Sequence, residues 1–358
     1  MAFGAHAPLD AADQNGRPDV YLLERATNRV TLVSRNLSGG AGRGSSRCPR
    51  VSGDGQRVVF ESDAADLVES DTNGANDVFV FDRGTGTLRR IAPMTAGPAM
   101  SARPALSADG RVVVFDARQV DATSDQRLHV YRLWLDTPGD AEDLGDGHSA
   151  TVSADGRVVA FVTRLRPGAP QVIRVVGPVS MRNVGEPTGQ VSAEDVFAPT
   201  LSADGQWIAY VSRPASTRDG RADAARAQVY AERVGGGVRH LVSATPEGRE
   251  ANGFSKLPAI DGTGTLVAFE STATNIGCRP RGGVSCDTDV NLLSDIFLWD
   301  RTTGIVTRVN VATSELPWLE GAAYPTLSSD GTSIAFLSRQ PVSDADGRDT
   351  FELFVARR

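Results

Sequence analysis

One phrase recurs six times in this chain and constrains its fold more than any other feature. It reads Pro, any residue, Val/Leu/Ile, Ser, any residue, Asp-Gly and, two residues later, an apolar triplet ending in Phe or Tyr, most clearly at 49–60. The other copies span 104–115, 150–161, 199–210, 258–269 and 325–336. Copies without internal gaps, 46 to 67 residues apart, predict a repeat architecture.

Each part of the phrase indicates a piece of β-structure. Asp-Gly between two extended runs is a strong hairpin signal, because both central residues of a tight turn need positive φ. The Pro, which lacks an N–H, predicts the start of a strand rather than its middle. Continuous apolar runs such as Val58-Val59-Phe60 predict strands that are buried on both faces. In the fifth copy Thr263-Gly264 replaces Asp-Gly, so a looser turn is expected there.

Two further strands follow each phrase. The third is clearest at 77–82 and 295–300, where apolar and aromatic residues lie between two Asp residues. The fourth is polar and alternating, as in Leu88-Arg89-Arg90-Ile91, and such alternation is typical of a solvent-facing edge. The first unit lacks its first strand and the last unit lacks its fourth.

Four-stranded antiparallel units of this length predict an all-β fold, a β-propeller. Counting the partial units at both ends gives seven blades, and six remain possible if the two ends merge into one blade. A single domain over 1–358 is expected. Its predicted blades are a partial one at 1–35, full ones near 48–92, 103–145, 148–185, 198–243 and 257–311, and a terminal one at 323–358.

Composition narrows the classes of partner. The net charge is −7, with acids and bases interspersed, which argues against a nucleic-acid groove. No apolar stretch has the length of a membrane span, and we expect a monomer. Cys278 and Cys286 have a spacing that permits a disulfide, whereas the alternative reading leaves all three thiols, Cys48 included, unpaired.

The phrase, together with a downstream Asp-Val/Ile-Phe-Val/Leu-x-Asp-x-x-Thr-Gly, resembles the WD40-like propeller repeat of the TolB family, over nearly the whole chain. An N-terminal α/β domain like that of TolB is not recognisable. The resemblance implies a binding scaffold in a periplasmic or secreted setting, although Met1 to His6 lacks the basic region and apolar core of a signal peptide. Fold-level resemblance implies little more.

Candidate binding residues lie in the long connections between the second and third strands and between consecutive units. Long loops on a rigid scaffold commonly carry function, and aromatic residues and Arg dominate binding hot spots. We therefore predict a loop-face surface that binds a protein or a glycan. Its predicted residues are Phe197, Arg249, Phe254, Glu315, Trp318 and Tyr324.

Two loops share the pattern Asp-x-Asn-Gly-x-x-Asp. Their oxygen-bearing residues are Asp13, Asn15 and Asp19 in the first, and Asp71, Asn73 and Asp77 in the second. Alternating oxygen ligands around a Gly suit Ca²⁺, but no Glu supplies the bidentate ligand of an EF-hand. The alternative is that Asp and Asn bond the loop backbone and start the next strand.

Enzyme motifs are not found: there is no Gly-x-Ser-x-Gly, no His-Glu-x-x-His and no Walker loop. The four histidines, His6, His129, His148 and His240, show no metal-ligand spacing. The sequence therefore predicts a non-catalytic binding scaffold. A propeller lyase or hydrolase acting on a polysaccharide or peptide at the channel mouth, and a structural module stabilised by calcium, remain the alternatives.

Overall fold

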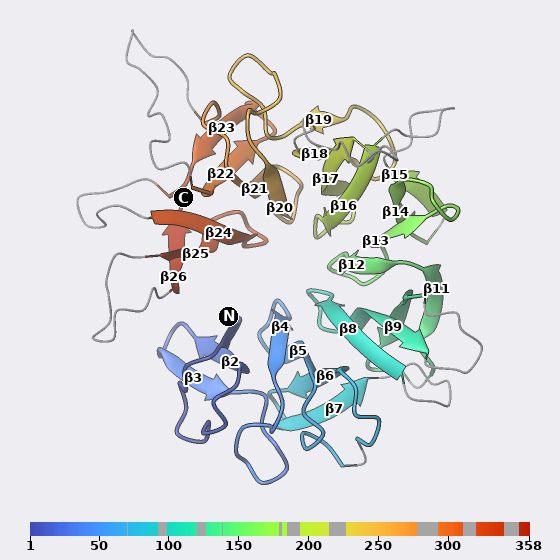
Figure 1. The fold of residues 1–358 in the computed structure, drawn as a ribbon, viewed down its shortest axis with the longest axis vertical. Helices are drawn as coiled ribbons and strands as arrows, with labels where there is room; N and C mark the ends of the chain where they lie inside the picture. The colour runs from blue at the N-terminus through green and yellow to red at the C-terminus, as the bar shows by residue number, and fades with distance from the viewer. Residues whose placement is uncertain are drawn as a thin grey trace. The chain divides into compact units, whose positions relative to one another are not determined.

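All regular secondary structure in the described part of the chain is β-strand (Figure 1). The computed structural model describes residues 1–69, 71–91, 99–119, 127–137, 139–178, 181–184, 194–214, 227–277, 293–310, 320–339 and 351–358. Within these ranges no helix is long and apolar enough to cross a membrane. The predicted pair Cys278 and Cys286, and the predicted binding residues Glu315 and Trp318, lie outside the described residues.

The strands form seven sheets, and within each sheet the strand order follows the chain order. The first four sheets contain β1 (Ala2–Ala5), β2 (Asp19–Glu24) and β3 (Arg29–Leu32); β4 (Ser46–Val51), β5 (Arg57–Ser62), β6 (Asp77–Asp82) and β7 (Thr87–Ile91); β8 (Ala99–Leu106), β9 (Val112–Gln119), β10 (His129–Trp134) and β11 (Glu142–Asp146); β12 (His148–Val152), β13 (Val159–Arg164), β14 (Gln171–Val176) and β15 (Met181–Val184). The last three contain β16 (Glu194–Leu201), β17 (Trp207–Pro214), β18 (Gln228–Arg233) and β19 (His240–Leu241); β20 (Ser255–Ile260), β21 (Leu266–Ser271), β22 (Asp295–Asp300) and β23 (Ile305–Arg308); β24 (Glu320–Leu327), β25 (Ser333–Arg339) and β26 (Phe351–Arg357).

These sheets are the seven blades of the predicted β-propeller. The two ends of the chain form separate three-stranded sheets, β1-β2-β3 and β24-β25-β26, so the count of seven holds and the merged blade of the six-blade alternative does not form. The chain divides into two compact units, Met1–Thr163 with Val176–Ser180, and Arg164–Val175 with Met181–Arg358. The prediction of a single domain stays a prediction.

The apolar triplet of each phrase occupies the second strand and is buried on both faces. In the second sheet, Val58, Val59 and Phe60 are fully buried. Val58 and Phe60 pack toward the first sheet, together with Val20 and Leu22, while Val59 packs toward the third sheet with Val113 and Phe115. Burial of one such side chain contributes about 1.5–3 kcal/mol, so the triplets stabilise the packing between neighbouring sheets.

The turn after the first strand differs from the predicted Asp-Gly hairpin. In the copy at 104–115 only Gly110 has positive φ, at 72°, and the turn closes with Ser107 N–H donating to the Val112 carbonyl at 2.9 Å. Ser107 Oγ donates to Asp109 Oδ1 at 2.6 Å and accepts from Val112 N–H at 2.9 Å, while Asp109 also accepts from Arg111 N–H at 3.0 Å. Ser and Asp therefore hold a four-residue loop, and the repeat keeps both for this structural reason.

The fifth copy reaches the same geometry with its residues exchanged. Asp261 stands at the Ser position, and its Oδ1 accepts from Thr265 N–H at 2.7 Å and from Leu266 N–H at 3.1 Å. Thr263, at the Asp position, donates its hydroxyl to Asp261 Oδ2 at 3.0 Å. Because the carboxylate has replaced the hydroxyl as the acceptor, this turn is also held by side chains.

The Pro of the phrase lies inside the first strand, which corrects its predicted place at the strand start. Strands β8, β16 and β24 begin at 99, 194 and 320, upstream of the Pro. In six sheets the strand pairing is interrupted by a β-bulge around the residue before the Pro position, and that residue has φ between 50 and 57°. These bulge residues are Cys48, Arg103, Ser149, Ala198, Leu257 and Tyr324. Pro is tolerated there because a bulge leaves its position without a ladder hydrogen bond.

Loss of the buried turn hydroxyl tests this account of the repeat. Ser107→Ala leaves the N–H of Val112 without its side-chain acceptor and should lower the free energy of unfolding by about 1–3 kcal/mol. Chemical denaturation followed by circular dichroism measures the change. Ser38→Ala is the control: its side chain is exposed and the change should stay within about 0.5 kcal/mol. Equal stability of the two variants would contradict a structural role for the Ser.

Candidate functional site

The bulges in the first strands present backbone N–H groups that no ladder partner uses, and carboxylates on the preceding sheet bind three of them. Glu61 Oε2 accepts from Arg103 N–H at 2.8 Å, and Asp116 Oδ2 accepts from Ser149 N–H at 2.9 Å. In the second unit Glu270 Oε2 accepts from Tyr324 N–H at 3.4 Å. Each acid directly follows the aromatic residue of a phrase, at Phe60-Glu61, Phe115-Asp116 and Phe269-Glu270.

In the first unit these contacts surround a buried carboxylate. The Asp116 side chain is fully buried, and its Oδ2 also accepts from Arg103 Nε at 2.6 Å. Asp116 Oδ1 is buried and has no hydrogen-bond partner among the described residues. Burial raises the pKa of Asp116 above its usual value, and the Ser149 N–H and the Arg103 guanidinium oppose that rise. No sequence prediction named Asp116, although an acid directly after the repeat aromatic is a visible signal in the sequence.

In the second unit a partly exposed cation lies beside two exposed aromatic residues. Lys256 Nζ on β20 lies 3.0 Å from Glu270 Oε1 on β21, and the Glu270 side chain is almost completely buried. Phe254, two residues before Lys256, is 59% exposed, and Tyr324 on the adjacent strand β24 is 65% exposed. Glu270 thus contacts both Lys256 and the backbone of Tyr324. The exposed residues Phe254, Lys256 and Tyr324 are together called here the Phe254–Tyr324 surface.

The backbone of Phe254 is fixed although its ring is exposed. Its N–H donates to Thr272 Oγ1 at 3.1 Å, and its carbonyl accepts from Thr272 N–H at 3.0 Å. Two residues earlier, Asn252 exchanges hydrogen bonds with Thr274: its Nδ2 donates to Thr274 Oγ1 at 2.8 Å and its Oδ1 accepts from Thr274 N–H at 2.9 Å. An exposed aromatic on a fixed loop loses little conformational freedom on binding.

The remaining predicted binding residues are placed differently. Phe197 and Tyr324 lie in the first strands β16 and β24 rather than in loops, because the bulge lets each strand extend upstream of the Pro. Phe197 is half-buried, packs against the core between the fifth and sixth sheets, and has the Arg213 guanidinium 5.2 Å from its ring centroid. Arg249 is exposed in the connection after β19, where its carbonyl accepts from Thr245 N–H at 2.8 Å.

The two Asp-x-Asn-Gly loops are closed by hydrogen bonds of their own side chains. Asn15 Nδ2 donates to Asp19 Oδ2 at 2.7 Å, and Asn73 Nδ2 donates to Asp77 Oδ2 at 2.9 Å. The Oδ1 atoms of Asn15 and Asn73 accept hydrogen bonds from the backbone N–H groups of Arg17 and Ala75, at 2.7 and 2.9 Å. These are the hydrogen bonds expected from the alternative to calcium binding, in which Asp and Asn bond the loop backbone.

The other acids of these loops also have protein partners. Tyr21 donates its hydroxyl to Asp13 Oδ2. In the second loop, Arg90 brings its guanidinium to 3.1 Å from Asp71 Oδ1 and 3.3 Å from Asp77 Oδ2, so one side-chain cation already pairs with both acids. Among the described residues no group of three or more His, Cys, Asp or Glu side chains is arranged to hold a metal ion.

The Asp that ends each of these loops belongs to a contact repeated in four sheets. The first residue of the third strand is buried, and its side chain accepts a hydrogen bond from a side chain that follows the fourth strand in sequence. That second side chain also accepts a hydrogen bond from the backbone N–H of the second residue of the third strand. The pairs are Asp19 with Ser34, Asp77 with Ser101, Gln228 with Ser243, and Asp295 with Asn310. Gln228 makes the same contact without a charge, which shows that the position serves strand pairing.

Calcium coordination by these two loops stays a prediction. The hydrogen bonds within the loops indicate what a test with added calcium should find. Because the Asn amide nitrogens and Arg90 occupy the acids, we expect the same melting temperature in excess calcium and in excess EDTA. Differential scanning calorimetry makes the comparison. A ligand that binds only the folded state raises the melting temperature, so a higher value in calcium would establish coordination and contradict this expectation.

Asp77 should make stability depend on pH. Burial raises its pKa from 3.8 to about 6, against the opposing effects of Arg90 and Asn73. A folded-state pKa above the unfolded value means that the folded state binds the extra proton, so this group favours folding below about pH 4 and loses that contribution as the pH rises through about 6.

The free energy of unfolding of wild type, measured relative to Asp77→Asn, should therefore rise as the pH falls from 6 to 4. Urea denaturation at both pH values checks this. A pH-independent difference between wild type and Asp77→Asn would show that Asp77 has the same pKa in the folded and the unfolded protein.

The sequence matches no protein-family model and no curated protein. Solved structures are similar to it. The β-propeller domain of the Trilobed protease from Pyrococcus furiosus aligns with a TM-score of 0.56 over 94% of this chain and 86% of that domain, at 11% identity. This chain has the β-propeller fold. A prolyl endopeptidase aligns with a TM-score of 0.60 over 95% of this chain but only 47% of the endopeptidase, at 12% identity.

The similar structures also include TolB from Acinetobacter baumannii, as the resemblance of the repeat phrase predicted. That alignment has a TM-score of 0.45 and 15% identity, and it covers 81% of this chain and 61% of TolB. The chain therefore spans less than two thirds of the TolB and endopeptidase chains that it matches. At these identities the likeness shows the fold alone.

Proposed function

We propose that this propeller is a non-catalytic binding scaffold that recognises a protein or a glycan through the Phe254–Tyr324 surface. The observation that carries the proposal is the exposed Phe254 ring on a backbone fixed by Thr272. Large aromatic side chains dominate binding hot spots, and fixing them beforehand lowers the entropic cost of binding. The TolB-like repeat supports the same interpretation, and with it we propose a periplasmic or secreted setting.

The polar centre of this surface supports specificity. Lys256 is half-exposed while its partner Glu270 is buried, so the ammonium group of this surface is accessible to a ligand. Opposite charges across an interface fix the register of a partner more than they raise its affinity. The proposed ligand therefore offers an apolar or ring-shaped group beside an acceptor or an acidic group.

The test begins with arrays of immobilised glycans and peptides that identify a ligand of the wild-type chain. The double variant Phe254→Ala/Tyr324→Ala should then bind that ligand at least about a hundredfold more weakly, because each hot-spot residue contributes about 2 kcal/mol or more. Surface plasmon resonance measures both affinities. Val238→Ala, at another exposed apolar residue of the second unit, should bind as wild type does. Wild-type affinity in the folded double variant would remove this surface from the function.

A catalytic role is the second candidate, and the unpaired Asp116 Oδ1 favours it. A buried carboxyl group with a raised pKa beside Arg103 has the properties of a general acid. One similar structure is a prolyl endopeptidase, so peptide substrates are the first to assay. Turnover by wild type that is abolished in Asp116→Asn would replace the scaffold proposal with this one.

A further inference from the structure

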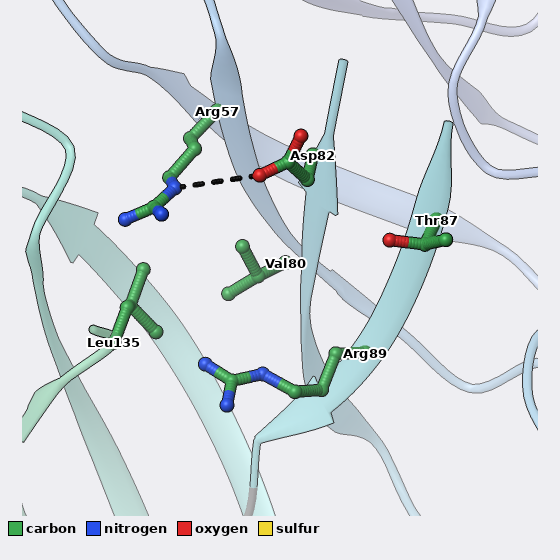
Figure 2. A pocket seen from close by; sticks show the side chains of 6 residues that line it. All are labelled: Arg57, Val80, Asp82, Thr87, Arg89 and Leu135. Atoms are coloured by element: carbon green, nitrogen blue, oxygen red, sulfur yellow. Dashed lines mark ion pairs between the residues drawn. The ribbon is translucent and has the colours of Figure 1, made fainter. Parts of the chain in front are cut away.

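A small cavity in the first unit lies between the second and third sheets. Its volume is about 180 Å³, and six residues line it: Arg57, Val80, Asp82, Thr87, Arg89 and Leu135. Figure 2 shows the apolar side chains of Val80 and Leu135 between the two guanidinium groups, with Arg57 beside Asp82 on one side and Arg89 on the other. The cavity is thus apolar at its centre and charged at its rim.

The guanidinium of Arg57 is already occupied by the protein. Its Nη1 donates to the Gly110 carbonyl at 2.8 Å, and its Nη2 donates to Asp136 Oδ1 at 2.5 Å. Its Nε lies 3.7 Å from Asp82 Oδ2, across the cavity rim (Figure 2). Arg57 therefore shapes the cavity wall and offers little to a ligand.

Arg89 differs from Arg57 and from its own neighbour in β7. Arg90, the next residue, pairs with Asp71 and Asp77. Arg89 makes no hydrogen bond or ion pair with any described residue, and its side chain is exposed. Figure 2 shows its guanidinium directed toward Leu135 along the cavity. The guanidinium of Arg89 thus reaches an apolar recess without a hydrogen-bond acceptor among the described residues.

The charges of the rim select the kind of anion. Arg89 offers planar paired donors that match a carboxylate. The lining residues Arg57, Arg89 and Asp82 carry a formal net charge of +1. Asp136, outside the lining, accepts a hydrogen bond from Arg57, and this bond with the charges of Arg57 and Arg89 holds its pKa below the usual value. At most one positive charge is therefore available to a ligand, which disfavours a dianion such as phosphate. Val80, which is 6% exposed, and Leu135 supply surface for a short aliphatic group.

The size of the cavity limits the ligand further. Pockets for whole drug-sized ligands have volumes of roughly 300–1,000 Å³, so 180 Å³ takes only a small acid or the last residue of a chain. We propose that this cavity binds a monocarboxylate carrying a short branched aliphatic group, either a free small acid or the C-terminal residue of a peptide ending in Leu or Val. The proposal is independent of the Phe254–Tyr324 surface.

The probe is N-acetylleucine, with N-acetylleucinamide as the uncharged match, and isothermal titration calorimetry on the full chain gives the affinities. We expect the acid to bind with a dissociation constant of about 1 mM or lower and the amide to bind at least about tenfold more weakly, since a charge-assisted hydrogen bond is lost. Equal affinity for acid and amide, or no heat from the acid at about 10 mM, would overturn the proposal.

Two variants locate the site. Arg89→Gln should weaken the binding of N-acetylleucine about ten- to hundredfold, whereas Arg29→Gln, at an exposed Arg in β3, should leave it unchanged. Both should keep a melting temperature close to that of wild type, because both side chains are exposed. Unchanged binding in Arg89→Gln would place the acid elsewhere and contradict the site.

The source of the carboxylate is decided by a second ligand pair. An acetylated pentapeptide ending in Leu that binds more tightly than N-acetylleucine assigns the site to a peptide C-terminus, whereas weaker binding of the pentapeptide assigns it to a free small acid. A pentapeptide amide that binds as well as the pentapeptide acid would contradict carboxylate recognition in either case.

Discussion

The fold depends on the burial of one apolar strand per sheet on both of its faces. A sheet by itself buries neither face of such a strand, so both faces must pack against neighbouring sheets. Aromatic stacking repeats within the sheets: in six of them a ring of the second strand stacks on a ring of the third, with centroids 5.7–6.2 Å apart. In the fifth sheet Tyr210 and Tyr230 form the pair, and the Arg239 guanidinium lies 3.6 Å from the Tyr230 ring centroid. The two tyrosine rings keep the stacked geometry although the Arg239 guanidinium lies against them.

The bulge before each Pro is the second constraint, and it links the fold to the candidate sites. A non-glycine residue in the left-handed region costs about 1–3 kcal/mol, and such strain persists only where surrounding contacts fix it. Carboxylates supply three of those contacts by accepting the N–H of Arg103, Ser149 and Tyr324. The same acids bring Arg103 and Lys256 into fixed positions. The carboxylates that accept hydrogen bonds from the bulged backbone thus also hold cationic side chains at the first strands.

Aromatic and cationic residues are distributed so that the two candidate surfaces use different chemistry. The Phe254–Tyr324 surface exposes large rings on fixed backbone and a partly neutralised ammonium group. The cavity in the first unit instead is lined by aliphatic groups and by the exposed side chain of Arg89. Repeats make such divergence possible, because each blade keeps its turn, bulge and apolar strand while the residues between them vary freely.

The sequence alone determined the all-β class, the repeated four-stranded units and the buried aromatic of each phrase, because alternation and turn residues act locally. It left six or seven blades open, and the separate terminal sheets decided for seven. It predicted the wrong turn and the wrong place for the Pro, since the Ser107–Asp109 hydrogen bond and the bulge arise only once two strands pair. Tertiary structure also moved Phe197 and Tyr324 from loops into strands. Only tertiary structure brought Glu270 to Tyr324, or Leu135 to Arg89. These partners lie on separate sheets, and their meeting depends on packing between repeats, which no local pattern in the sequence encodes.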